Sequence, residues 1–278
     1  MTILVFGRGF LGHRLARDLP GAVLHDADIA DEVAVAAALE QHRPTAVVNA
    51  AGKTGKPNVD WCETHQEETY RSNVEGALVL ARRCAKQGVY LLHLASGCIF
   101  YGPSPSPGGW REDDFANPKA FYSRTKYAAD LVLSKLDHVG IARLRMPIDD
   151  HPSDRNLITK LARYERIIDV ENSVTVVQDL VEVVRALVSK RAKGVFHVTN
   201  PGTMRHRDLI ALYRELVDPA HRCEFIAEEE LVRLGLASVG RSNCILASER
   251  LSELGISMRP VDVALRDAVA KYAVAARS

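Results

Sequence analysis

The amino-terminal stretch TILVFGRGFLG, residues 2–12, joins a short apolar run to a turn that carries three glycines. Residues 2–6 have the length and β-branched content of a buried strand, and residues 10–19 have the apolar spacing of a helix. In such a unit the first glycine permits a tight turn, the second admits a dinucleotide's diphosphate, and the third lets the helix pack against the strand. The amide groups at the helix start then bind the diphosphate. The predicted cofactor-loop residues are Gly7, Arg8, Gly9, Phe10, Leu11 and Gly12.

The residues after this turn leave the choice of dinucleotide open. An acid that binds the adenosine ribose is expected about 20 residues beyond the loop, and Asp26 or Asp28 could serve. Alternatively, Asp28 or Asp31 caps the next helix. Arg8 could pair with a 2′-phosphate, which favours NADPH over NADH, or it could be a solvated charge. We therefore expect NADPH, with NADH as the alternative.

Strand-like and helix-like segments alternate along the first half of the chain. Further strands are predicted at residues 22–25, 45–49, 89–95 and 141–145, and further helices at 31–42, 62–86 and 122–136. This alternation predicts an α/β fold, a doubly wound (Rossmann) parallel sheet with helices on both faces. We expect a cofactor-binding domain at residues 1–147. A smaller, mainly helical C-terminal substrate-binding lobe is expected at residues 148–278, interleaved with late sheet strands.

The composition of the 278 residues narrows the class of protein. Hydrophobic residues make up 47% and charged residues 26%, which excludes a disordered chain. The 36 Lys and Arg balance 35 Asp and Glu, so no basic field favours nucleic acid or an anionic membrane as a partner. The start lacks the features of a signal peptide, and five dispersed cysteines suit a reducing cytoplasm. We expect a cytoplasmic enzyme for a small molecule, without a metal; its oligomeric state is open, with a homodimer as one arrangement.

A tyrosine and a lysine, Tyr122 and Lys126, lie one helical turn apart in a predicted helix. A free tyrosine has a pKa near 10, and lowering it to about 7 needs about 4 kcal/mol. One ammonium about 4 Å away supplies about that much at an effective dielectric constant near 20. Ser96 follows a predicted strand, at the sheet edge where α/β proteins bind ligands. Its hydroxyl could hold a carbonyl that Tyr122 protonates.

The glycine loop, the strand-end serine and the Tyr-x-x-x-Lys pair, in this order, resemble the extended short-chain dehydrogenase/reductase family. The turn Asn49-Ala50-Ala51 looks like the cofactor-lining turn of that family, and Asn73 matches its helix asparagine. The resemblance covers essentially the whole chain and implies a reductase that uses a nicotinamide cofactor.

Finer motifs resemble one subgroup, the nucleotide-rhamnose synthase epimerase-reductases, which are relatives of dTDP-4-dehydrorhamnose reductase. These motifs are GKPNVDWCE (55–63), SGCIF (96–100), RMPI (145–148), NLITK (156–160) and RSN (241–243). The resemblance implies that Cys98 and Lys160 are an acid/base pair for epimerisation and that Ser96, Tyr122 and Lys126 serve the reduction. The substrate contacts that it implies are Lys53, Thr54, Asn58, Asp60, Trp61, Asn156, Arg241 and Asn243.

Each of these residues has a simpler interpretation. Cys98 could be a small buried hydrophobe, and Lys160 a solvated charge. Asp60 and Glu63 have the spacing of a capping box, so Asp60 could cap a helix. Arg241 could grip a diphosphate or form a surface ion pair. Two features depart from the family pattern. The glycine loop is one residue shorter than the G-x-x-G-x-x-G common in the family. The Pro/Ser/Gly-rich segment 103–109, which we expect to be a lid, differs from the family in its composition.

The leading hypothesis is a bifunctional 3,5-epimerase/4-reductase that converts a UDP- or dTDP-linked 4-keto-6-deoxyglucose to the rhamnose nucleotide. One alternative is a 4-ketoreductase only. The other is a non-catalytic, NADP-binding regulatory subunit, for which an intact Ser96, Tyr122 and Lys126 would serve no purpose.

Overall fold

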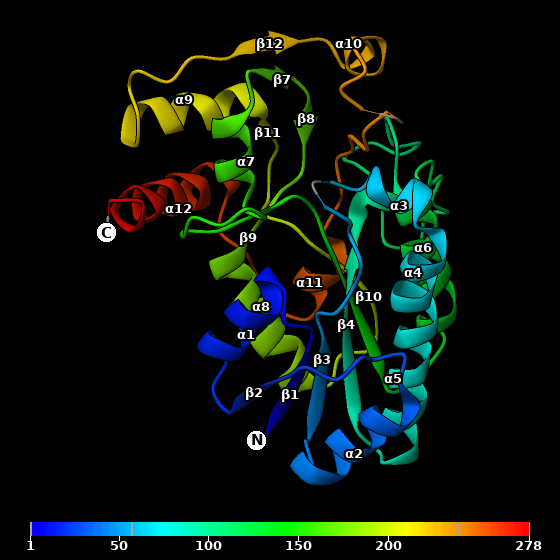
Figure 1. Cartoon of the computed structure of the whole chain (residues 1–278). Coiled ribbons are helices and arrows are strands. Elements are labelled where there is room, and N and C mark those ends of the chain that lie inside the picture. Colours follow the sequence, from blue (N-terminus) through cyan, green and yellow to red (C-terminus); the bar gives the residue numbers. More distant parts are fainter. Residues whose placement is uncertain (1, 57, 238–239, 278) are drawn as a thin grey trace. The chain divides into compact units, whose positions relative to one another are not determined.

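The computed structural model describes residues 2–56, 58–237 and 240–277 (Figure 1). The chain divides into two compact units. Unit 1 comprises Met1–Ile99, Phe115–Arg143 and Val184–Phe196, and unit 2 comprises Phe100–Asp114, Leu144–Val183 and His197–Ser278. The predicted domain division at residue 147 lies close to the passage from unit 1 to unit 2 at residues 143 and 144. Later segments return to unit 1, so each unit is assembled from separate stretches of chain.

A six-stranded sheet with the order β10-β5-β4-β3-β1-β2 forms the centre of unit 1. Its strands are β1 (Ile3–Phe6), β2 (Ala22–His25), β3 (Ala46–Asn49), β4 (Tyr90–Ser96), β5 (Val139–Leu144) and β10 (Gly194–Val198). The pairings of β1 with β2, β1 with β3, and β3 with β4 are parallel, with Ile3 opposite both Ala22 and Ala46. The parallel α/β fold predicted from the alternating pattern is confirmed.

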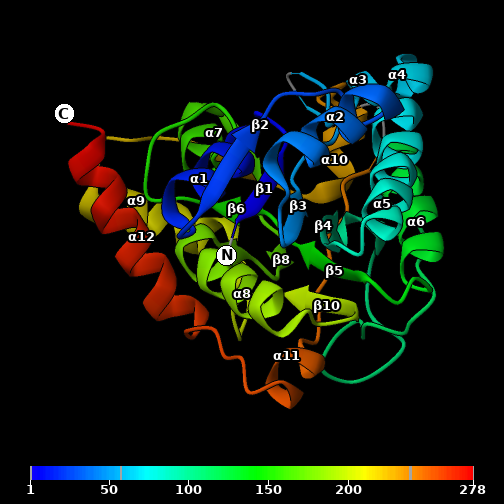
Figure 2. The same cartoon turned by 90° about the horizontal axis from the view of Figure 1, so that it is seen from below.

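Helices cover both faces of this sheet (Figure 2). One layer contains α2 (Glu32–His42), α5 (Gly76–Lys86) and α6 (Phe121–Leu133), and the other contains α1 (Phe10–Asp18) and the second half of α8 (Val177–Lys190). In the first layer, Leu39, Leu80 and Leu133 pack with Leu4 and Val47 of the sheet, and all five are essentially inaccessible to water. Burial of such strands on both faces explains why their sequences are continuously apolar rather than alternating.

The helix predicted at residues 62–86 consists of four segments and is interrupted once, at His65. They are α3 (Trp61–Thr64), α4 (Gln66–Tyr70), the π-helical turn η1 (Arg71–Glu75) and α5. A short 3₁₀ turn, η2 (Gly97–Ile99), also follows β4. The prediction of one continuous helix was therefore wrong at His65, which separates α3 from α4; from Gln66 to Lys86 the chain stays helical and passes through the π turn.

Unit 2 is mainly helical, as expected for the carboxyl-terminal lobe. Its helices are α7 (Leu157–Arg163), α9 (His206–Leu216), α10 (Glu228–Arg233), α11 (Glu249–Glu253), α12 (Val261–Ala275) and the start of α8. Three two-stranded sheets pair β11 (Met204–Arg205) with β8 (Glu171–Asn172), β12 (Glu224–Ile226) with β7 (Arg166–Ile168), and β6 (Pro147–Ile148) with β9 (Thr175–Val176). Side chains of α7, α9 and α12, among them Ile158, Leu209 and Leu265, form its apolar core. Among the described helices of the chain, none combines the length and the apolarity that a membrane crossing requires.

Candidate active site

The glycine-rich turn packs directly against the turn after β3. A side chain on Gly7, which has a φ of +107°, would lie 2.4 Å from the backbone nitrogen of Ala51, and one on Gly12 would lie 1.7 Å from the Gly7 carbonyl oxygen. Positions 7 and 12 therefore admit only glycine. A side chain on Gly9 would meet nothing within 4 Å, so the space above the start of α1 is open. Gly9 is the N-cap of α1 and gives it no side-chain cap, which leaves the first amide groups of that helix available to a diphosphate.

The acidic residues beyond the loop have distinct roles. Asp31 caps α2 by accepting hydrogen bonds from the backbone N–H groups of Val33 and Ala34, so the capping interpretation is confirmed for Asp31. The Asp28 carboxylate accepts the backbone N–H of Ala30 and pairs with Arg71 at 2.7 Å, and these contacts lower its pKa.

Arg8 lies beside the other acidic candidate. Its Nη1 is 3.1 Å from Asp26 Oδ2, and both side chains are more than half exposed. An ion pair of this kind contributes about 1 kcal/mol or less, so Arg8 could exchange Asp26 for an incoming phosphate at little cost.

A single amide connects the turn after β3 to the helix that carries the Tyr-x-x-x-Lys pair. Asn73, in the π turn η1, accepts the backbone N–H of Lys53 through Oδ1 at 2.7 Å. Its Nδ2 donates to the Lys53 carbonyl at 3.0 Å and to Thr125 Oγ1 at 3.1 Å. Asn49 at the end of β3 accepts the N–H of Ala51 and shapes the turn through Ala50. Asn73 is thus a structural partner of the cofactor-lining turn.

Ser96 and Tyr122 meet at the carboxyl end of β4. The Ser96 hydroxyl oxygen accepts the backbone N–H of Cys98 at 3.1 Å, and the Ser96 hydroxyl lies close enough to Tyr122 to favour its ionised form. Cys98, in η2, is partly buried and close enough for its charge to influence Tyr122. The structure therefore brings together three of the five predicted catalytic residues, a hydroxyl, a phenol and a thiol, in unit 1.

The pKa of Tyr122 is not lowered as the sequence predicted. Burial raises it above its ordinary value, the neighbouring Cys98 adds to the rise, and the hydrogen bond with Ser96 opposes it. Lys126 is not among the groups that shift this pKa most. The described hydrogen bonds of Lys126 Nζ go to Leu94 and His93 and not to the Tyr122 hydroxyl, and burial lowers the pKa of Lys126 itself to about 8. Its Nζ donates to the Leu94 carbonyl at 3.0 Å and lies 3.2 Å from His93 Nε2.

The unit 1 residues expected to contact substrate surround α3. Lys53 pairs with Glu68 at 3.1 Å, and its Nζ lies 5.2 Å from the centre of the Trp61 ring. Thr54, in the loop between β3 and α3, is partly buried. Asn58 accepts the backbone N–H of Asp60 at 2.8 Å. Pro57, in the same motif, lies outside the described residues.

The capping box expected from Asp60 and Glu63 does not form. Asp60 occupies the N-cap position of α3 but makes no side-chain capping bond to it. Glu63 instead accepts the backbone N–H of Phe121, at the start of α6.

In unit 2, the amide of Asn156 is used entirely by the protein. Its Oδ1 accepts the N–H groups of Ile158 and Asp149, and its Nδ2 donates to the carbonyls of Asp149 and His151. The residue is 0% exposed. The expected substrate contact was therefore wrong: Asn156 caps α7 and shapes the loop before it.

Lys160 is partly buried on α7, and its pKa is lowered by burial and by the positive charges of Arg155 and Arg241. Arg155 and Arg241 are each close enough to Lys160 to repel its positive charge, a gathering of cations that suits an anion. Asn243 accepts an N–H of Asn172 through Oδ1, whereas its buried Nδ2 has no partner among the described residues. An unpaired buried donor is costly, so this amide is suited to a ligand.

The segment expected to be a lid is tied to the strand-like stretch that follows Arg241. The N–H of Gly102 donates to the Asn243 carbonyl, and the N–H of Trp110 donates to that of Ile245. Trp110 stacks on Phe100 with ring centres 4.8 Å apart. Both flanks of residues 103–109 are therefore anchored within unit 2.

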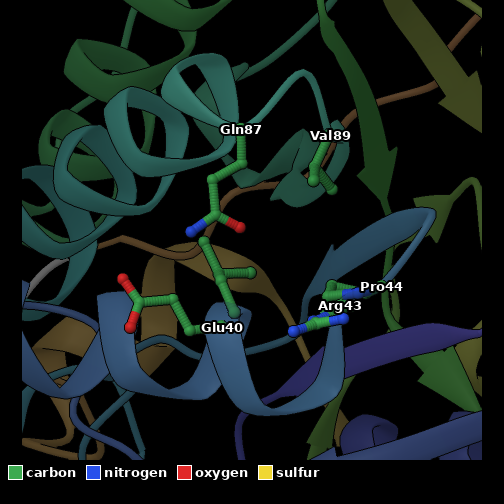
Figure 3. Close-up of a pocket in the computed structure, with 6 residues that line it drawn as sticks. Glu40, Arg43, Pro44, Gln87 and Val89 are labelled. Atoms are coloured by element: carbon green, nitrogen blue, oxygen red, sulfur yellow. The ribbon is translucent and has the colours of Figure 1, made fainter.

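A hollow in unit 1 lies at the opposite edge of the sheet, where β3 and β4 begin (Figure 3). It is lined by Leu39, Glu40, Arg43, Pro44, Gln87 and Val89. None of the predicted site residues lines it, and its lining side chains include neither a hydroxyl nor a thiol.

The roles of two polar residues near Ser96 and Tyr122 were not predicted from the sequence: that of His93, and that of Glu63, which was considered only as part of a capping box with Asp60. His93 is an imidazole in the middle of a buried apolar strand, three residues before Ser96. A titratable group in such a position demands a partner, and this signal could have identified it. Glu63 gave no such signal, because its partner is a backbone group 58 residues away.

A comparison with protein families matches residues 1–272 to the profile described as RmlD substrate binding domain. Among curated proteins, the chain is 38% identical over 227 residues to the bifunctional dTDP-4-dehydrorhamnose 3,5-epimerase/dTDP-4-dehydrorhamnose reductase of Arabidopsis thaliana, covering 80% of this chain and 75% of that protein. It is also 35% identical over 241 residues to a trifunctional UDP-glucose 4,6-dehydratase/UDP-4-keto-6-deoxy-D-glucose 3,5-epimerase/UDP-4-keto-L-rhamnose-reductase from the same plant. That match covers 84% of this chain, which spans only 35% of the longer protein.

Solved structures show the same fold. The L780 UDP-rhamnose synthase of Acanthamoeba polyphaga mimivirus superposes with a TM-score of 0.90 at 29% identity, over 98% of this chain and 99% of that chain. The dTDP-4-dehydrorhamnose reductase of Bacillus anthracis, solved in complex with NADP, gives a TM-score of 0.83 at 21% identity, over 99% of both chains.

Proposed function

The chain belongs to the RmlD substrate-binding-domain family, and from this premise we propose that it is an NADPH-dependent reductase of nucleoside-diphosphate 4-keto-6-deoxy sugars that also epimerises C3 and C5. The product is the rhamnose nucleotide. The observation that carries the proposal is the proximity of the Ser96 and Tyr122 hydroxyl groups at the carboxyl end of β4, a strand of the same sheet that bears the glycine-rich turn. The nucleoside diphosphate is UDP or dTDP, the two that the relatives' names contain.

The residues of the turn fit a nicotinamide dinucleotide. The open space above Gly9 and the uncapped start of α1 suit a diphosphate, and Arg8 has a guanidinium that can reach a 2′-phosphate by leaving Asp26. The cofactor supplies a hydride to C4 of the sugar. The turn of Asn49, Ala50 and Ala51 forms the floor of this region through its contact with Gly7.

The reduction is proposed to use the hydroxyl groups of Ser96 and Tyr122. Ser96 Oγ accepts the N–H of Cys98, and we propose that its own proton, which faces Tyr122 in the absence of substrate, forms a hydrogen bond with the sugar O4 when substrate is bound. Tyr122 gives its own proton to O4 as the carbonyl becomes an alcohol. The raised pKa of Tyr122 keeps this phenol protonated, which suits a proton donor better than a base.

The epimerisation is proposed to use Cys98 and Lys160 as acid and base. A C4 ketone acidifies the hydrogens at C3 and C5, so a base that removes one and an acid that returns it from the other face invert the centre. Lys160 has the chemistry of a base, because its lowered pKa increases the fraction of free amine near neutral pH. The proposed ligands of the nucleotide sugar in unit 2 are Arg241 and the unpaired amide of Asn243, with Lys53 and Trp61 of unit 1 as further contacts.

The test is incubation of the protein with UDP- and dTDP-4-keto-6-deoxyglucose in heavy water. Without NADPH, proton NMR should show deuterium entering C3 and C5; with NADPH, mass spectrometry and NMR should identify the rhamnose nucleotide. Reduction without any deuterium exchange would show that the protein is a 4-ketoreductase without epimerase activity. Binding of NADPH without oxidation on either substrate would instead indicate the regulatory subunit.

A further inference from the structure

We propose that Arg145 and Asn172 are positioning residues that fix the side-chain amide of Asn243 as a hydrogen-bond donor to an oxygen of the substrate's diphosphate. The inference deepens the proposed function and rests on it for the identity of the ligand. The orientation of the amide follows from hydrogen bonds within unit 2 alone.

The chain of hydrogen bonds begins at Arg145, the residue after β5, whose guanidinium can only donate. Its Nη2 lies 2.5 Å from a terminal side-chain atom of Asn172, at the end of β8. The backbone N–H of Cys244 donates to the same atom at 3.0 Å. Because both neighbours are donors, this atom is the oxygen, Oδ1, and the NH₂ group of Asn172 points the other way.

The amide of Asn172 in turn orients the amide of Asn243. Asn172 Nδ2 lies 3.2 Å from the side chain of Asn243. Since an NH₂ group only donates, the atom of Asn243 that faces it is the oxygen, Oδ1. The NH₂ group of Asn243 is therefore turned away from Asn172.

The other orientations of the two amides bring donors together. Rotating Asn243 alone would place two NH₂ groups opposite each other. Rotating both amides would turn the NH₂ of Asn172 toward the guanidinium of Arg145 and the N–H of Cys244. Asn172 and Arg145 are 0% and 2% exposed, so water cannot satisfy these donors, and such an arrangement is costly.

The backbone around Asn243 is also held in place. Arg145 Nη2 donates to the carbonyl of Ser242, which precedes Asn243. The carbonyl of Cys244, which follows it, accepts the N–H of Ser173 at 3.1 Å. The Asn243 side chain therefore leaves an anchored backbone with its amide in one orientation.

The Nδ2 atom of Asn243 is the donor that this arrangement leaves over. It is buried, and it has no acceptor among the described residues. A ligand oxygen that accepts from it removes the cost of an unmatched donor. Because Nδ2 is covered, that oxygen reaches it only after a small movement of the groups around it.

Positive charge near this segment favours an anionic oxygen as the acceptor. Arg241, two residues before Asn243, and Arg155 both act on the charge of Lys160. A diphosphate carries its negative charge on oxygens that only accept, so it matches both the cations and the fixed NH₂ group. The carbonyl oxygens of a pyrimidine also accept, and the experiment distinguishes the two sources.

The first arm of the experiment is NMR of the whole chain with ¹⁵N-labelled asparagine. The side-chain NH₂ signals of Asn243 are those lost in Asn243→Ala. Titration with UDP, dTDP or inorganic diphosphate should move these signals downfield, and uridine should leave them in place. A response to uridine alone, or no response to UDP and dTDP, would overturn the assignment.

The second arm uses Asn172→Asp to turn the amide of Asn243 without altering Asn243. The new carboxylate still accepts from Arg145 and Cys244, but its second oxygen faces Asn243 and attracts the NH₂ group. The NH₂ signals should then move downfield without nucleotide and no longer respond to UDP. Calorimetry should show that UDP binds about tenfold more weakly, which corresponds to about 1.4 kcal/mol. Reduction should show a higher KM with kcat little changed, and urea unfolding should show a stability near that of wild type.

A double-mutant cycle separates the turned amide from the added negative charge. Asn243→Ala alone should also weaken UDP binding by about tenfold. In the Asn172→Asp background it should cost nothing further, because the donor is already turned away. Additive losses would mean that Asn172→Asp acts only through its charge and would contradict the relay. If Asn172→Asp does not fold, the titration of the wild type still decides the assignment.

Turnover distinguishes failure of this inference from failure of the proposed function. If UDP and dTDP move the Asn243 signals but no 4-keto sugar nucleotide is reduced, the proposed function fails and the diphosphate assignment stands. If the sugar nucleotide is reduced and the Asn243 signals never respond, the assignment fails and the reductase function stands.

Discussion

The carboxylate of Glu63 accepts the backbone N–H of Phe121, with Oε1 and nitrogen 2.7 Å apart across 58 residues of chain. Phe121 is the first residue of α6, and Ala120, the N-cap, contributes no side-chain capping bond. Glu63 therefore caps, from a different helix, the very turn that carries Tyr122. A carboxylate also interacts favourably with the positive end of the helix dipole.

Glu63→Ala should loosen the start of α6. The lost cap should lower the free energy of unfolding by about 1–2 kcal/mol, and kcat should fall more than KM rises, because Tyr122 lies in the first turn. Urea unfolding and steady-state reduction measure these two effects. Glu63→Gln, which keeps an acceptor oxygen, should lie near wild type, and so should Glu67→Ala on exposed α4. Equal losses in the alanine and glutamine variants would show that charge, and not the hydrogen bond, matters.

Tyr122→Phe should abolish NADPH oxidation, with a fall of about 100-fold or more, because no other hydroxyl is proposed to protonate O4. Deuterium exchange at C3 and C5 should persist, because Ser96 still holds the carbonyl. Absorbance of NADPH and NMR of the sugar measure the two reactions on the same sample. Wild-type reduction rates in this variant would remove Tyr122 from the mechanism.

Cys98→Ala should have the converse effect. Exchange should fall by about 100-fold or more, while a substrate that is already epimerised should still be reduced. Cys84→Ala is the matched control, since Cys84 is a buried thiol whose pKa is raised to about 12 by burial and which takes no part in the proposed chemistry. If Tyr122→Phe and Cys98→Ala each lost both activities to the same extent, the division of roles would be wrong.

Arg8→Gln should change the choice of cofactor. Loss of the guanidinium should weaken binding of NADPH by about tenfold, which corresponds to about 1.4 kcal/mol, and should leave NADH binding nearly unchanged. Fluorescence titration measures both affinities. Arg17→Gln provides the control, because Arg17 is an exposed arginine of α1 that pairs with Asp18. A parallel loss of NADH affinity would mean that Arg8 binds a group common to both cofactors.

The positive charges of Arg155 and Arg241 help to lower the pKa of Lys160. Neutralising one of them in Arg155→Gln should raise the pKa of Lys160. The pH at which the rate of deuterium exchange begins to increase should therefore be higher in this variant than in the wild type. The sign follows because the free amine is the base and a higher pKa delays its appearance. Arg163→Gln on the same helix, where Arg163 pairs with Asp154, should leave the profile in place. An unchanged profile in Arg155→Gln would separate Lys160 from the exchange step.

The local structures around the proposed site that the sequence predicted correctly are formed by residues close together in the chain. The three glycines follow one strand directly, and Tyr122 and Lys126 are one turn apart, so local spacing was sufficient. The fold class also followed from local patterns, because parallel strands buried on both faces leave continuous apolar runs.

The parts that could not be predicted depend on contacts between distant segments or on burial. Asn156 looked like a substrate contact, but its amide is consumed by carbonyls and N–H groups of its own loop. The pKa of Tyr122 was predicted with the wrong sign because the spacing to Lys126 gave no information about the burial of both residues. His93 was missed because its partners Asn49 and Lys126 are 44 and 33 residues away in the chain.

The carboxamide of Asn73 grips the backbone of Lys53 from both sides and also holds Thr125 on α6. These hydrogen bonds join the turn after β3 to the helix that carries Tyr122. We therefore expect a displacement of that turn to be transmitted to α6 through the Asn73 amide.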